Sequence, residues 1–570
     1  MHTYRNRVGV LIAFCCFFTG LFSQVKPKNA DFGPPLKIPL VLAGNFCELR
    51  PNHFHTGLDI KTQGRQGLAV TSIADGFVSR IAYSHYGYGL VLYIDHPNGY
   101  TSVYAHLRST NETIAKKIKE IQYKEKSETF NVYLDSTDLL VKKGEVIGLS
   151  GSSGSSYAPH LHFEIRQTKT EYAVNPLLFD FDIKDTRKPD IKGVKVYPLD
   201  DSSSVYGKQE AVYVPVRNGT VTKSISANGK IGLGIHATDR LNAAGNVCGV
   251  YSIDLFANKD KIYHHNMELM DFDKNRYINH HKDYVEYTFN KRNIHKNFIK
   301  GNNQLPIYDS LKNNGILRIN KGDVIDVSYI IKDVYENTSR LKFKIIGVEG
   351  KPKEHESCSH ELLWDKPNAF DTTDFGFLMA PLTLYDDQCL RYKKSNASGF
   401  LSDVHLINSY RIPVQKYFTI KIKPTVQLSD EFNNKLLIVF QDKKGRLQAR
   451  GGEFLEGYVH TKVREYGPYG LMIDTIAPYC NWVTNINSLK GLNKNSKIQW
   501  KIGDNLSGLN TYNVYIDDKW VLAVYNRKRN TLTFDLSDTD IKPGTYNLTL
   551  RLSDERQNKY EEVVKLTILD

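Results

Sequence analysis

Cysteine, methionine and tryptophan are scarce: the 570 residues of this chain include 7 Cys, 5 Met and 4 Trp. Cys15 and Cys16 lie in an N-terminal apolar segment, and the other five form an odd, widely spaced set. Such a set excludes a small scaffold built on disulfides. Export would permit one or two bridges, and the nearest plausible pair is Cys358 with Cys389. The remaining cysteines are Cys47, Cys248 and Cys480.

Long apolar runs are also missing, with one exception at the N-terminus. Residues 8–22, "VGVLIAFCCFFTGLF", follow the basic "MHTYRNR" and precede the polar "SQVKPKN". This order is typical of a secretory signal and predicts a signal peptide over residues 1–23. Because the run is shorter than the ~20 residues that span a bilayer, an uncleaved anchor is the less favoured alternative. We therefore expect an exported chain, most readily periplasmic, otherwise at the cell surface or secreted, without a transmembrane helix after processing.

Acidic residues are outnumbered, since 62 Asp and Glu face 75 Lys and Arg, for a formal charge of +13. The excess is spread along the chain, which is typical of an ordinary solvated basic surface. The alternative is attraction to a polyanion. An exported protein meets cell-wall polymers and anionic lipid before nucleic acid, so we predict no nucleic-acid partner.

Short alternating segments rich in Tyr and Phe predict a mainly β chain. A first domain is expected at residues 24–184. One stretch within it, 111–128, has isoleucines at helical spacing among lysines and glutamates, and predicts an inserted amphipathic helix. That helix is either a charged, solvated element or a lid beside a site.

A weak internal repeat divides the rest of the chain. "DTRKPDI" at 185–191 resembles "DTIAPYC" at 474–480, and each copy continues with an Asp-rich turn and closes with a strand after Asp and Asn. This pattern predicts Ig-like β-sandwich modules at 185–348, with an insertion, and at 474–570. The stretch between them, 349–473, is predicted to be a further β-rich domain.

Five polar side chains in the first domain form a candidate site. His55 and Asp59 are four residues apart, His106 follows in "YAHL", and His160 and His162 share one face of an alternating strand. Two histidines and a carboxylate would suit a catalytic zinc ion with an open position, and two further histidines could handle protons. A lone His-x-His is more often structural, but the order, the spacing and the Gly/Ser-rich approach favour a metal site.

These segments, "HTGLDI", "YAHL" and "PHLHFEI", resemble the signature of the lysostaphin-type (LytM-type) zinc endopeptidases, which cut peptide bonds in bacterial peptidoglycan. The resemblance covers about residues 45–175. It implies a lysostaphin-type antiparallel β metallopeptidase domain with one Zn²⁺ ion. It further implies that His55, Asp59 and His162 bind the metal, and that His106 and His160 are the catalytic pair.

The activity implied is hydrolysis of cross-links or stem peptides of peptidoglycan, with the β-sandwich modules positioning the enzyme or binding an envelope protein. Relatives with degenerate sites act as non-catalytic activators of wall hydrolases, and a cell-envelope scaffold is a further alternative. All five site residues are present here, which favours an enzyme.

Overall fold

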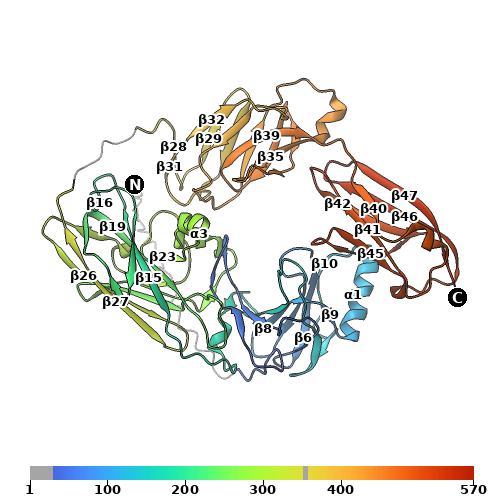
Figure 1. Ribbon diagram of the computed structural model, residues 1–570, viewed down its shortest axis with the longest axis horizontal. Helices are drawn as coiled ribbons and strands as arrows, with labels where there is room; N and C mark the ends of the chain where they lie inside the picture. Colours follow the sequence, from blue (N-terminus) through green and yellow to red (C-terminus); the bar gives the residue numbers. More distant parts are fainter. Residues whose placement is uncertain (1–29, 351–356, 570) are drawn as a thin grey trace, which may run out of the picture.

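Four β-rich modules follow one another around a ring in the computed structural model, which describes residues 30–350 and 357–569 (Figure 1). Each has its own hydrophobic cluster: chiefly residues 36–183 in the first module, 194–345 in the second, 362–471 in the third and 489–568 in the fourth. The predicted mainly β fold is confirmed. The predicted signal peptide lies outside the described residues, and no helix within them is long and apolar enough to cross a membrane.

The first module is built on a 10-stranded sheet whose central strand, β13, is the alternating segment seen in the sequence. On one face of β13, Leu161, Phe163 and Ile165 are fully buried in the core, so His162 and Glu164 point to the other face. Along its main path the sheet runs β1 (Leu42–Gly44), β4 (Leu58–Lys61), β13 (His160–Gln167), β8 (Tyr100–Leu107), β7 (Leu90–Asp95), β6 (Gly76–Tyr83) and β10 (Phe130–Tyr133). A smaller sheet contains β5 (Ala69–Thr71), β12 (Val146–Leu149) and β9 (Ser109–Thr110).

The turn between β7 and β8 contains Asn98 and Gly99, a pair that is typical of hairpin turns, and the two strands are antiparallel. Gly99 has a positive φ of 85°, the conformation that such a turn requires. The predicted helix is also present as α1 (Glu112–Glu125), between β9 and β10. The Asn111 side chain caps its first turn by accepting a hydrogen bond from the Ile114 amide.

The second module is a 12-stranded sheet around the long strand β19, which pairs with β15 on one side and with β27 on the other. Its path is β18 (Thr220–Val221), β17 (Val212–Arg217), β15 (Asp190–Pro198), β19 (Ile225–Thr238), β27 (Thr338–Gly347), β26 (Val324–Lys332), β20 (Ser252–Ala257), β21 (Asp260–Asn266) and β24 (Tyr308–Leu311). Between β21 and β24 an insertion carries β22 (Leu269–Met270), α2 (Ile278–His281), α3 (Tyr284–Asn290) and β23 (Ile294–Lys296).

Two five-stranded antiparallel sheets enclose the core of the third module. One contains β29 (Asn368–Asp371), β30 (Phe375–Met379), β34 (Phe418–Ile422), β38 (Tyr458–Val463) and β37 (Glu453–Leu455). The other contains β32 (Tyr392–Ser395), β33 (Val404–Ile407), β39 (Gly467–Ile473), β35 (Leu436–Gln441) and β36 (Leu447–Ala449).

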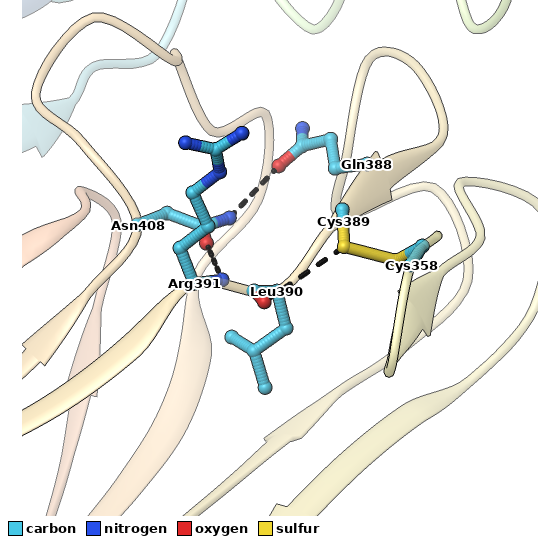
Figure 2. Close-up of a disulfide and its surroundings, with 6 residues drawn as sticks. All are labelled: Cys358, Gln388, Cys389, Leu390, Arg391 and Asn408. Atoms are coloured by element: carbon cyan, nitrogen blue, oxygen red, sulfur yellow. Dashed lines mark hydrogen bonds between the residues drawn. A yellow bond between two sulfur atoms is a disulfide. The ribbon is translucent and has the colours of Figure 1, made fainter. Parts of the chain in front are cut away.

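The expected Cys358–Cys389 disulfide is confirmed and lies at the start of this third module (Figure 2). It ties the entering chain to β31 (Gln388–Cys389), which pairs with β28 (Glu361–Leu362). Beside it the Asn408 side chain accepts a hydrogen bond from the Arg391 amide at 2.6 Å and donates one to Gln388.

The fourth module packs two four-stranded sheets face to face around the fully buried Trp500. The sheets are β40 (Tyr479–Trp482), β41 (Lys497–Gly503), β45 (Thr531–Asp535) and β44 (Ala523–Asn526), and β43 (Lys519–Val521), β42 (Leu509–Ile516), β46 (Gly544–Asp554) and β47 (Lys559–Ile568).

The internal repeat has a structural counterpart in the second and fourth modules. Within each triad of aspartates, carboxylate oxygens lie within 4.8 Å of one another. In both modules an asparagine side chain donates to the last aspartate of the triad, and each of these bonds is 2.7 Å long. The triads are Asp185, Asp239 and Asp333, and Asp474, Asp504 and Asp554; the asparagines are Asn337 and Asn558.

Contacts between the fourth module and the first close the ring seen in Figure 1. Buried Glu128, just after α1, accepts hydrogen bonds from the Tyr512 hydroxyl at 2.9 Å and the Tyr525 amide at 3.0 Å. Lys528 donates to the backbone carbonyls of Ser152 at 2.7 Å and Ser156 at 2.5 Å. The fourth module is therefore hydrogen-bonded to the Gly/Ser-rich loop that leads to β13.

We expect the closure of the ring to depend on pH through Glu128. Burial raises the pKa of this carboxyl from 4.5 to about 7. The pKa of Glu128 is higher in the folded chain than in the unfolded chain, so its contribution to the free energy of unfolding is complete below pH 4.5. That contribution falls by about 3 kcal/mol as the pH rises through 7. A Glu128→Gln variant keeps the acceptor oxygen without the charge, and should melt at a higher temperature than wild type at pH 8 but not at pH 4.5. Glu125→Gln, at the exposed end of α1, is the control; an equal shift in both variants would contradict the prediction.

Candidate metal centre

Three of the five residues singled out in the sequence converge on one point between adjacent strands. Asp59 on β4 lies directly opposite His162 on β13 in the strand register, and His55 lies three residues before the start of β4. His55 Nε2 lies 3.0 Å from His162 Nδ1 and 3.1 Å from Asp59 Oδ1, and His162 Nδ1 lies 3.0 Å from Asp59 Oδ1. Ligand atoms about 2.05 Å from a tetrahedral zinc ion are about 3.3 Å apart, so this donor set fits zinc.

The remaining polar atom of each of these side chains is held by a neighbour. His55 Nδ1 lies 2.7 Å from the Asn45 carbonyl, and His162 Nε2 lies 2.8 Å from Glu164 Oε1. The Arg50 guanidinium donates to Asp59 Oδ2. Both imidazoles therefore donate outward and present their other nitrogen, with its lone pair, to the common point.

The electrostatics at this point favour a cation. Burial opposes the charge on Asp59, but His55, His160 and His162 outweigh it and hold the pKa of the Asp59 carboxyl well below 3.8. Burial also lowers the pKa of His162, but hydrogen bonds to Asp59 and Glu164 outweigh this effect and raise it to about 9. Burial lowers the pKa of His55 to about 4, so that ring is neutral at pH 7. A proton or a metal ion is therefore stabilised at His162 Nδ1.

Glu164, which contacts His162 Nε2, is itself completely buried. It accepts hydrogen bonds from the Thr56 hydroxyl at 2.6 Å, the Tyr88 hydroxyl at 2.5 Å and Arg166 Nε at 2.8 Å. Although burial opposes the charge, Arg166 and these donors lower the pKa of Glu164, so the carboxylate is ionised. The alternation of β13 puts Glu164 on the same face as His162, but the sequence analysis gave Glu164 no role. Arg50, Asn45 and Tyr88 were missed because nothing in their local sequence indicates these contacts.

The other two predicted residues, His106 and His160, face each other beside this point, with ring centroids 4.7 Å apart. His106 Nδ1 lies 2.9 Å from the Ser153 carbonyl, and His160 Nδ1 lies 2.9 Å from the Ala158 carbonyl. Each ring thus donates from Nδ1, and His160 Nε2 lies 3.4 Å from Asp59 Oδ1.

His106 adopts an unusual backbone conformation, with φ = 61°, at the end of β8. A non-glycine residue there is strained by about 1–2 kcal/mol. Burial, reinforced by the nearby His162 and His160, lowers the pKa of its imidazole to about 3, so His106 is neutral. The ring is positioned by Ser153, in the same loop that Lys528 holds from the fourth module.

Residues 53–126 and 121–176 match the family described as Peptidase family M23, and residues 359–474 match a Zu5-like domain. The first module thus matches peptidase family M23, which confirms the resemblance seen in the motifs. The Ig-like classification of the later modules stays a prediction.

Three curated relatives match this chain over 112 to 149 residues. An "Uncharacterized metalloprotease" from Haemophilus influenzae is 34% identical over 149 residues, 26% of this chain and 24% of its own length. "DD-carboxypeptidase/endopeptidase Mpg" from Neisseria meningitidis is 33% identical over 112 residues, 20% of each chain. "Murein hydrolase activator NlpD" from Escherichia coli is 34% identical over 123 residues, 22% of this chain and 25% of its own. This chain therefore covers a quarter or less of each of these relatives.

Among solved structures, the catalytic domain of lysostaphin from Staphylococcus simulans is 24% identical. The match covers 24% of this chain and 90% of that one, with a TM-score of 0.18.

Proposed function

We propose that this chain is an exported, zinc-dependent endopeptidase that hydrolyses peptide cross-links or stem peptides of bacterial peptidoglycan. One observation carries the proposal: two imidazole nitrogens and a carboxylate oxygen converge within 3.1 Å, with two further histidines facing the same point. His55, Asp59 and His162 would hold one Zn²⁺ ion. When bound, that ion supplies Lewis-acid activation of water and of the scissile carbonyl.

The chain's own residues would do the positioning. Neutral His106 accepts a hydrogen bond at Nε2 from a water molecule, because its Nδ1 is committed to Ser153. His160, held at Nδ1 by the Ala158 carbonyl, receives a proton at Nε2 and stabilises negative charge that develops on the carbonyl oxygen. Glu164 keeps His162 in the tautomer that a metal requires.

The enzyme would act in the periplasm or at the cell surface, and its later modules would position it or bind an envelope protein. The alternative is a non-catalytic activator of wall hydrolases, because one of the relatives named above is called a murein hydrolase activator. The complete set of five site residues favours hydrolysis.

Digestion of purified sacculi tests the proposal. The full mature chain is expected to release peptides, identified by mass analysis, at least 10²-fold faster than its His160→Ala variant. His53→Ala, on the exposed part of the hairpin just before the site, is the matched control and should keep wild-type activity. A wild-type chain that binds no zinc and releases nothing would favour the activator.

A further inference from the structure

A second group of histidines converges in the second module, outside the peptidase domain. His265 on β21, His281 on α2 and His295 on β23 are at most 1% exposed. One ring nitrogen from each lies within 4.8 Å of the others, and His281 Nε2 is 2.9 Å from His295 Nδ1. Three elements of the module and its insertion thus bring three potential metal ligands to one buried point.

Two tyrosines orient the rings. The Tyr263 hydroxyl lies 2.8 Å from His265 Nδ1, and the Tyr308 hydroxyl lies 3.0 Å from His281 Nδ1. These contacts leave the Nε2 atoms of both histidines for the shared point. His265 Nε2 is enclosed and has no hydrogen-bond partner among the described residues. A buried polar atom without a partner costs free energy, and coordination would satisfy it.

The arrangement repeats the one at the peptidase site in the same chain. There the converging ligand atoms are 3.0–3.1 Å apart, and here the closest pair is 2.9 Å apart. In each group, two histidines have their outward ring nitrogen held by an oxygen atom. Imidazole suits zinc among the common biological divalent metals, and three histidines are an established zinc donor set.

The position of the group suggests what an ion would do there. The His281 ring packs against Phe54, with ring centroids 5.6 Å apart, and Phe54 directly precedes His55. The Asn275 side chain, just before α2, bonds both the amide and the carbonyl of Phe54. Lys282 donates to the Arg50 carbonyl at 2.6 Å. The insertion therefore supports the β2 (Leu49–Arg50) and β3 (His53–Phe54) hairpin, which leads into the peptidase site.

We propose that His265, His281 and His295 bind a second zinc ion. Because all three ligands are buried, the site is structural and closed to substrate. The bound ion would stabilise the insertion against the hairpin that carries Arg50 and leads to His55. The ion would join β21 of the sheet to α2 and β23 of the insertion.

Zinc content of the full chain tests this site separately from the peptidase site. After incubation with excess zinc and desalting, wild type should contain two zinc ions per chain. His265→Ala and His162→Ala should each contain one, and the double variant none. His264→Ala is the matched control and should keep two, because His264 points to the other face of β21 and bonds Asp254 at 2.8 Å.

The proposal would be overturned if wild type contained one zinc ion and His162→Ala none. It would also be overturned by equal zinc content in the His265 and His264 variants, or by residual zinc in the double variant. If His265→Ala does not yield folded protein, His265→Gln and the comparison of wild type with His162→Ala decide. Failure of the peptidase assignment would instead appear as unchanged zinc in His162→Ala.

Discussion

Replacing His162 with alanine is expected to remove one equivalent of zinc and all measurable hydrolysis, whereas His160→Ala should keep its zinc and lose turnover. His162 Nδ1 lies 3.0 Å from both His55 Nε2 and Asp59 Oδ1, so its loss removes one of three converging donors. His160 stands outside that triangle, with its Nε2 3.4 Å from Asp59 Oδ1. Its removal should slow peptide release by about 10²–10⁴-fold.

Metal analysis and sacculus digestion on the same preparations distinguish the two roles, with His53→Ala as the control. Equal zinc loss in the His160 and His162 variants would mean that the division into ligands and proton handlers is wrong. An unchanged zinc content in both variants would place the ion elsewhere.

Glu164→Gln should give the second large effect, on stability and on metal affinity together. The substitution leaves Arg166, 5% exposed, without its main counter-charge, and breaking such a buried pair costs about 3–5 kcal/mol. Because Glu164 also holds His162 Nε2, zinc affinity should fall about 10–100-fold. Urea unfolding and competition with a chromogenic chelator measure the two effects.

Glu171→Gln is the matched control, since Glu171 contacts the same arginine at 3.1 Å but its side chain is 57% exposed. An exposed ion pair contributes at most about 1 kcal/mol, so this variant should remain close to wild type. Adding Arg166→Met to Glu164→Gln should recover part of the lost stability. Similar losses in the Glu164 and Glu171 variants would contradict the role of burial.

Much of the first module could be predicted from short motifs. The alternation of "HLHFEI" fixes which side chains of β13 face the core, and the Asn-Gly pair fixes the β7–β8 hairpin. The helical spacing of isoleucines located α1, and the cysteine pair nearest in sequence forms the disulfide. These features depend on residues close in the chain, so the sequence determines them directly.

By contrast, contacts between distant segments could not be deduced. Asn45 and Arg50 support the metal site through single hydrogen bonds. Glu128 meets Tyr512 across 384 positions, so nothing local marks it as the closing contact of the ring. His265, His281 and His295 occur in unrelated local sequences and converge only because the insertion folds back over the sheet.

Local pattern and composition predicted the resemblance of the first module to peptidase family M23, its five candidate site residues and the mainly β character of the chain. The tertiary structure alone decided which ring nitrogens face a common point, which buried charges hold them there, and how the fourth module reaches the first. Those features depend on packing and on hydrogen bonds between segments far apart in the chain, which local sequence patterns do not predict.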